Sequence, residues 1–194
     1  MGQYKYSGTI TASVRFEYFP YPITDPAQDT LDILTAIAPD APLWKIQKEL
    51  SLLFVPENVL YRPFATLSSG EQTKALLAGL FLCENSFLLI DEPTNHLDMA
   101  SRQTVAEYLN GKSCFILVSH DRAFLDECIN HVLSLNKANI EIQIGNFSSW
   151  WNNKRMQDEY EIAENERLKK DIYRLETAAR RTAAWSDKVE KSKN

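Results

Sequence analysis

The sequence has few cysteines, few glycines and no long apolar run. Its three cysteines, Cys83, Cys114 and Cys128, are widely spaced and form no CxxC pair, which argues against a disulfide framework or a zinc site. The longest apolar stretch, residues 75–83, is interrupted by a glycine and is far below the roughly 20 residues that a membrane helix needs. No apolar segment of the signal-peptide type follows residues 1–6. We therefore expect a soluble, cytoplasmic protein with no membrane domain.

Charge is distributed unevenly along the 194 residues. Residues 1–153 contain 10 Lys and Arg against 17 Asp and Glu, a net charge of −7, whereas residues 167–194 contain 9 basic and 4 acidic residues, a net charge of +5. A basic end of this kind is either a solvated helix face or an electrostatic contact for nucleic acid. Composition alone leaves both alternatives open.

The hydrophobic pattern of the first half predicts one strand and a small helical layer. Residues 9–19 are rich in β-branched and aromatic residues and predict a strand that is broken at Pro20. Apolar residues at helical spacing then predict two short helices, at 31–37 and 44–53.

The central part predicts an α/β fold. Residues 87–90 and 115–118 are short, wholly apolar runs, which are typical of parallel strands buried on both faces. Residues 99–109 have helical character and complete a strand, helix, strand unit. Residues 132–135 and 140–144 predict a closing hairpin.

The last part of the chain predicts one long helix. From Trp150 onward there is no Pro or Gly and the composition is strongly charged. A helix over 152–194 would run about 60 Å, so it needs a supporting partner. A coiled-coil seam with alternating spacings of four and three residues is formed by Leu168, Ile172, Leu175, Ala179 and Thr182. The alternative is a free surface helix whose basic side chains face water.

Two carboxylates, Asp91 and Glu92, follow the apolar run directly. A buried strand delivers both groups rigidly to its C-terminal end. There Asp91 can hold Mg²⁺ through water, and Glu92 can act as general base toward an attacking water. The pattern alone is weak, because many strands end in acidic loop residues.

Two further segments contain groups that suit a phosphate. Hydroxyl residues and a glycine at 66–70 precede a helix predicted at 71–81, and free amides at a helix start bind anions. The same residues are equally an ordinary N-cap followed by an acidic first turn. His120 follows the strand predicted at 115–118, where an imidazole can reach a phosphate oxygen. A lone histidine there would more often be structural, but this one follows the neighbouring strand.

Three motifs together resemble an ATP-binding cassette (ABC) ATPase, a P-loop NTPase-like fold with parallel core strands and a helical subdomain. They are Leu-Ser-Ser-Gly-Glu-Gln at 67–72, Leu-Ile-Asp-Glu-Pro-Thr-Asn-His-Leu-Asp at 89–98 and Val-Ser-His-Asp at 118–121. The amino-acid motif at 92–98 is similar to that of ABC-F proteins, whose two cassettes lie in one chain and act on the translating ribosome. Residues 16–21 and 145–150 look like the antibiotic-resistance branch, which protects ribosomes from peptidyl-transferase-centre drugs.

The resemblance implies ATP and Mg²⁺ as cofactors and a role for each matching residue. Asp91 would coordinate Mg²⁺, Glu92 would activate water, and His120 would sense the γ-phosphate. The signature motif at 67–72 would instead meet a second nucleotide, held by a partner cassette, and Asn95, His96 and Asp98 would line the contact between cassettes. The expected cofactor-binding residues are Ser68, Ser69, Gly70, Glu71, Gln72, Asn95 and Asp98.

The sequence departs from the family pattern in three places. Ser69 stands at the first glycine position of the signature, and Tyr21 stands where a glutamine is expected. The phosphate-binding motif G-x-x-x-x-G-K-[ST] does not occur, because Gly-Lys-Ser at 111–113 has Ala106 in place of the earlier glycine and precedes a strand. We therefore expect a cassette truncated at its N-terminus that is inactive as an ATPase by itself.

The expected organisation is a partial cassette at 1–149, followed at 150–194 by the first helix of a coiled-coil linker arm. The implied partners are a second cassette, in the same longer chain or as a homodimer, and the ribosome, through rRNA or tRNA contacts of the C-terminal helix. One alternative is a non-catalytic module that docks on a partner cassette or ribosome. Another is the nucleotide-binding subunit of a membrane transporter, which the basic arm after the cassette disfavours.

Overall fold

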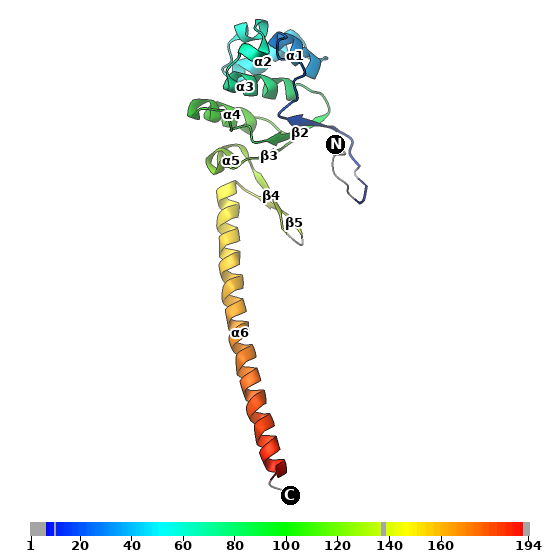
Figure 1. The fold of residues 1–194 in the computed structure, drawn as a ribbon. Helices are drawn as coiled ribbons and strands as arrows, with labels where there is room; N and C mark the ends of the chain where they lie inside the picture. The colour runs from blue at the N-terminus through cyan, green and yellow to red at the C-terminus, as the bar shows by residue number, and fades with distance from the viewer. Residues whose placement is uncertain (1–6, 10, 137–138, 192–194) are drawn as a thin grey trace. The chain divides into compact units, whose positions relative to one another are not determined.

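The computed structural model describes residues 7–9, 11–136 and 139–191, with side chains described through residue 182 (Figure 1). The chain divides into two compact units, Met1–His131 and Val132–Asn194. Among the described helices, none combines the length and the apolar character that a membrane span requires.

The first unit is built on a three-stranded parallel sheet. Its strands are β1 (Arg15–Phe19), β2 (Ser86–Asp91) and β3 (Phe115–Val118), in the order β1-β2-β3. The register places Tyr18 opposite Leu89. Because the strands are parallel, their carboxyl ends meet at one edge of the sheet, where the loops with the predicted catalytic residues begin.

Helices and short turns surround one side of this sheet, which confirms the predicted α/β fold. They are α1 (Thr30–Ile37), α2 (Leu43–Leu52), the 3₁₀ turns Glu57–Tyr61 and Phe64–Thr66, α3 (Ser69–Leu80), α4 (Met99–Asn110) and α5 (Arg122–Cys128). Figure 1 shows α1 and α2, which form the predicted helical layer, grouped with α3. The first predicted strand is shorter than expected, because its backbone enters the sheet only at Arg15.

Close packing of α1 against α3 depends on Gly79. A Cβ added at this position would lie 2.9 Å from Cδ2 of Leu34, which is fully buried. The glycine therefore lets the two helices approach each other. The largest fully buried side chains of the core include Leu34, Ile46, Leu50, Leu77, Leu80, Leu88, Ile90 and Leu109.

The expectation that the strands are buried on both faces is wrong for the part of the chain that the structure describes. Leu88 and Ile90 on one face of β2 are each 1% exposed. On the other face, Tyr18 is 49%, Ile116 44% and Val118 53% exposed. The reason is that the helices of the hydrophobic core pack only against the side of Leu88 and Ile90.

The second unit consists of a two-stranded sheet and one long helix. Strands β4 (His131–Leu135) and β5 (Ile140–Ile144) pair as predicted, and α6 (Phe147–Lys191) is a single helix of 45 residues. The helix begins before the predicted Trp150, because the Asn146 side chain accepts a hydrogen bond from the backbone N–H of Ser149 at 3.0 Å. The boundary at 149/150 that we expect between cassette and arm stays a prediction.

Candidate functional site

Asp91 ends strand β2 at the carboxyl edge of the sheet. Its Oδ2 accepts a hydrogen bond of 2.9 Å from the hydroxyl of Tyr18, on the neighbouring strand β1. This bond raises the pKa of Tyr18, because it favours the protonated phenol. The Tyr18 hydroxyl thus orients the carboxylate that the sequence predicts as the metal ligand.

Glu92 adopts a backbone conformation that is rare for its residue type, with φ at 48°. Its N–H still donates to the carbonyl oxygen of Val118 at 2.8 Å, so the backbone stays attached to β3. The side chain is 19% exposed, and Oε1 is buried without a hydrogen bond from any described residue. A buried carboxylate oxygen of this kind needs a polar partner, such as a water or a ligand.

His120 follows strand β3 and faces Glu92. Its Nε2 lies 3.5 Å from Glu92 Oε1, a separation that allows an ion pair but is long for a hydrogen bond. The imidazole is 97% exposed. The structure therefore brings together Asp91, Glu92 and His120, at the carboxyl ends of two adjacent strands.

The signature loop, residues 67–72, opens helix α3 with a capping box. The hydroxyl of Ser68 accepts from the backbone N–H of Glu71 at 3.3 Å, and Glu71 Oε2 accepts from the backbone N–H of Ser68 at 2.8 Å. The backbone and then the side-chain hydrogen bond from Ser68 lower the pKa of Glu71. Gln72 Nε2 donates to the carbonyl oxygens of Phe64 and Leu67, at 3.0 and 3.3 Å. The side chains of Glu71 and Gln72 are thus engaged in shaping the loop.

The loop at residues 94–98 lies beside the signature loop. Ser69 Oγ donates to the carbonyl oxygen of His96 at 3.4 Å, and a Cβ added at Gly70 would lie 3.7 Å from Cδ2 of Leu97. Asp98 caps helix α4 by accepting from the backbone N–H of Ser101 at 2.8 Å. The side-chain and backbone hydrogen bonds of Ser101 lower the pKa of Asp98.

Asn95 and His96 are exposed at this second cluster, as a contact surface requires. Tyr21, which stands at the expected glutamine position, packs against the hydrophobic core. Sequence reasoning gave no role to Tyr18 or Arg102. Their contacts with Asp91 and Asp121 join residues far apart in the chain, and no local pattern signals them.

Comparisons with known proteins agree on one kind of domain. Residues 9–95 match the protein family described as ABC transporter. The chain is 31% identical over 75% of its residues to the uncharacterized ABC transporter ATP-binding protein YkpA of Bacillus subtilis, of which it covers 28%. It is 37% identical over 68% of its residues to the ribosome protection protein VmlR of Bacillus subtilis, of which it covers 24%. It is 31% identical over 61% of its residues to the ATP-binding protein Uup of Haemophilus influenzae, of which it covers 20%.

Solved structures show the same fold. An ABC transporter of the metal-chelate type in an inward-facing conformation matches 71% of this chain and 62% of its own, with a TM-score of 0.56 and 23% identity. The archaeal ribosome recycling factor aABCE1, in complex with the stalk protein aP1, matches 67% of this chain and 26% of its own, with a TM-score of 0.51 and 24% identity. The chain spans less than a third of the length of the curated relatives named above.

Proposed function

We propose that the chain works as part of an ABC-F protein that hydrolyses ATP and acts on the ribosome. The match of residues 9–95 to the family described as ABC transporter and the ABC ATPase fold of the chain support this proposal. The observation that carries this proposal is the meeting of Glu92 and His120, whose Oε1 and Nε2 atoms lie 3.5 Å apart at the carboxyl edge of the sheet. The similarity to the ribosome protection protein VmlR supports the ribosome as the target and drug protection as the outcome.

The first nucleotide site uses the residues at the ends of β2 and β3. Asp91, oriented by Tyr18, would hold Mg²⁺, since a carboxylate at this edge is the donor that the ion prefers. When bound, the ion neutralises phosphate charge. Glu92 would accept the proton of the attacking water, for which Oε1, buried and without a hydrogen bond from any described residue, provides an acceptor. His120 donates a hydrogen bond to the γ-phosphate.

The second nucleotide site uses the start of helix α3. Ser68, Ser69 and Gly70 present hydroxyls and backbone N–H groups at the positive end of the helix dipole, where a phosphate is stabilised. Glu71 and Gln72 shape this turn through their hydrogen bonds. Asn95 and Asp98, on the adjacent loop, would face the partner cassette.

We propose that a second cassette, in the same longer chain or as a homodimer, holds the nucleotide that the signature loop contacts. Because the 194 residues contain no G-x-x-x-x-G-K-[ST] motif, the nucleotide at Asp91, Glu92 and His120 would also need a phosphate-binding loop from outside these residues. Helix α6 is proposed as the arm that contacts rRNA or tRNA.

The experiment that tests this function is ribosome co-sedimentation with ATP. It uses the chain within a longer protein in which each of two cassettes has a phosphate-binding loop. Glu92→Gln keeps the side-chain shape but removes the general base, so we expect the nucleotide-bound form to accumulate on ribosomes by about tenfold or more over the parent. Glu84→Gln, at an exposed acid before β2, is the matched control. Equal and nucleotide-independent ribosome binding for the parent and both variants would contradict the proposal.

A further inference from the structure

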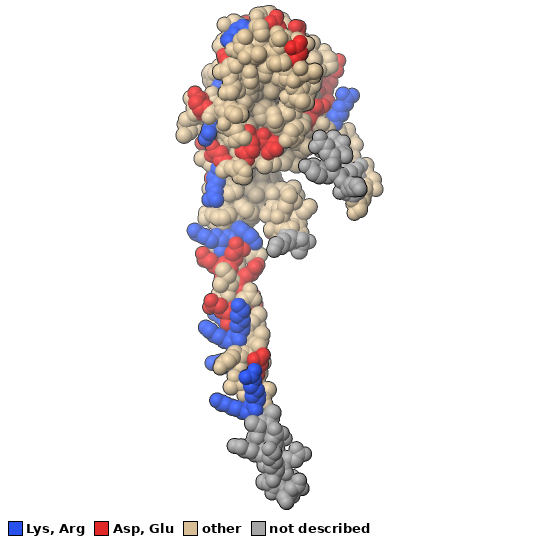
Figure 2. All heavy atoms as spheres, in the orientation of Figure 1, with Lys and Arg blue, Asp and Glu red and all other residues tan. Residues whose placement is uncertain are grey.

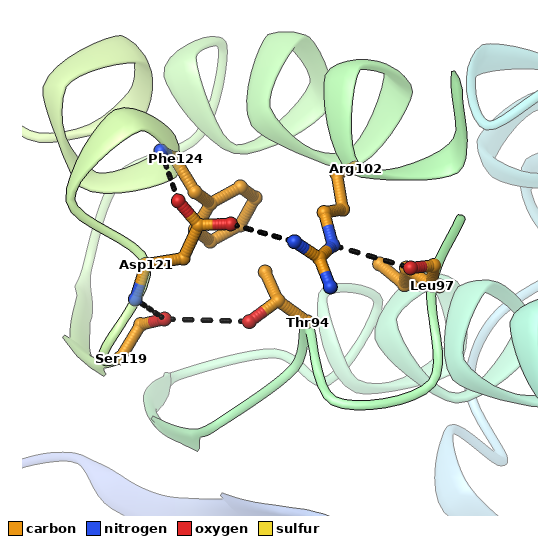
Figure 3. A network of polar contacts seen from close by, with 6 residues as sticks. All are labelled: Thr94, Leu97, Arg102, Ser119, Asp121 and Phe124. Atoms are coloured by element: carbon orange, nitrogen blue, oxygen red, sulfur yellow. Dashed lines mark hydrogen bonds and ion pairs between the residues drawn. The ribbon is translucent and has the colours of Figure 1, made fainter. Parts of the chain in front are cut away.

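Arg102, on helix α4, bridges two loops of the site (Figure 3). Its Nε donates to the carbonyl oxygen of Leu97 at 3.1 Å. Its Nη1 donates to Asp121 Oδ2, also at 3.1 Å, in an ion pair. One guanidinium group therefore contacts both the loop at 94–98 and the loop at 119–121.

The two loops meet at a second point. Ser119 Oγ accepts from the backbone N–H of Asp121 at 3.1 Å and lies 3.4 Å from Oγ1 of Thr94, which is 4% exposed. The remaining oxygen of Asp121, Oδ1, accepts from the backbone N–H of Phe124 at 3.1 Å and caps α5. Figure 3 shows these contacts as a continuous network from Leu97 to Phe124.

His120 lies between the two residues that this network holds. Its side chain is 97% exposed, so packing does not fix the imidazole. Its approach to Glu92 therefore depends on the backbone of Ser119 and Asp121. Both of these residues are tied to the loop at 94–98, Ser119 through Thr94 and Asp121 through Arg102.

We infer that Arg102 is a positioning residue: it holds the His120 loop in register with the loop at 94–98, so that the imidazole faces Glu92. This inference rests on the proposed function of His120 and Glu92. The loop at 94–98 also contacts the signature loop through His96 and Ser69. Arg102 thus links the residues of one nucleotide site to the residues of the other.

The chemistry of the side chain explains why an arginine is needed. The planar guanidinium places several N–H donors in a rigid fork, so it binds two acceptors in fixed directions. A lysine ammonium at the same position is a single point charge. The Arg102–Asp121 pair is partly exposed, with side chains 38% and 23% accessible, and such a pair adds little to overall stability. Its main effect is on the relative position of the loops.

Amide hydrogen exchange of the 194-residue chain, measured without nucleotide, tests this role. For Arg102→Met we expect exchange at 94–98 and 119–124 to rise by roughly tenfold, with α1 and α2 unchanged. Arg102→Lys should protect 119–124 better than 94–98, because one ammonium reaches one acceptor. Asp121→Asn should leave 94–98 better protected than 119–124, since Arg102 keeps its contact with Leu97. Gln103→Met, on the same helix, is the matched control, and we expect parent-like exchange.

Two exchange results would overturn the inference. An equal rise across α1 and α2 would show that Arg102 stabilises the whole unit. No rise in either loop would show that the contacts do not restrain them.

ATP hydrolysis by the chain within a longer protein, in which each of two cassettes has a phosphate-binding loop, gives the second readout. We expect Arg102→Met to lower kcat by roughly tenfold and leave KM for ATP near the parent value, with partial rescue by lysine. An unchanged kcat with loosened loops would also overturn the positioning role. A parent that does not hydrolyse ATP would contradict the proposed function, whereas the exchange result does not depend on it.

Discussion

Asp91 and Glu92 are neighbours in the chain but have different surroundings. Asp91 keeps the extended backbone of β2 and accepts a hydrogen bond from Tyr18. Glu92 has φ at 48°, which costs about 1 kcal/mol or more for a residue with a side chain. This conformation leaves its Oε1 buried and next to His120. The two carboxylates, to which we assign metal binding and water activation, thus differ in backbone conformation and in contacts.

Sequence patterns predict the residues that we propose to act on the nucleotide better than they predict the residues that position these side chains. Asp91, Glu92 and His120 each follow an apolar run, and the sequence places them at the ends of strands. Tyr18 and Arg102 have no such signal, because their partners lie 73 and 19 residues away and become neighbours only in the folded chain. Only the folded structure shows these two contacts.

One prediction concerns Ser68, the N-cap residue of α3. Ser68→Ala removes the side chain that caps α3, so the free energy of unfolding should fall by about 1 kcal/mol. Urea unfolding followed by circular dichroism measures the change. Ser51→Ala, at an exposed position of α2, should be near neutral.

The capping box also predicts how this difference depends on pH. The backbone N–H of Ser68 and then its hydroxyl lower the pKa of Glu71, so the ionised carboxylate stabilises the fold above its ordinary pKa, and this contribution is lost as pH falls through the lowered value. Ser68→Ala removes only the share that comes from the hydroxyl, which donates to Glu71 Oε2 at 2.8 Å. The gap between parent and Ser68→Ala should therefore narrow below about pH 4. A gap that is absent at neutral pH would contradict the capping role.

The elements differ in how far periodicity revealed them. Helix α6 and strands β4 and β5 follow strong patterns, and the sequence predicted all three. Helix α5 was missed because its seven residues are too few for a helical period to show. Its start is fixed by the side chain of Asp121. The exposed face of the sheet was also missed, because an apolar strand does not reveal whether both of its faces are covered.

A further prediction concerns the surface of helix α6. In Figure 2, its Lys and Arg side chains are interspersed with Asp and Glu. The apolar seam residues Leu168, Ile172 and Leu175 are 53%, 55% and 70% exposed, as a helix awaiting a partner would be. Residues 183–194, the end of the basic segment, lie outside the described side chains.

If α6 contacts RNA, replacing both Arg180 and Arg181 by Glu should weaken ribosome binding and reduce its salt dependence, because each lost phosphate contact removes counterion release. Co-sedimentation across a salt series, with the chain joined to its second cassette, gives both quantities. Arg155→Glu is the control, since Arg155 is already near Glu159, at 3.9 Å. Equal affinities and equal salt slopes for parent and double variant would show that α6 is a solvated helix that does not contact RNA.

For the whole molecule, we propose that the chain contributes parts to two nucleotide sites. Asp91, Glu92 and His120 would belong to one site, and the signature loop would belong to the other. The sheet also has an exposed apolar face, formed in part by Tyr18, Ile116 and Val118.

Single-turnover ATP hydrolysis tests most directly whether Glu92 is the general base of an ATPase. The assay uses the chain within a longer protein in which each of two cassettes has a phosphate-binding loop, and we expect the 194-residue chain alone to be inactive. Glu92→Gln should slow hydrolysis by about 10²-fold or more and leave ATP affinity unchanged, whereas Glu84→Gln should match the parent. Hydrolysis by Glu92→Gln at the parent rate would contradict the assignment of Glu92 as the general base.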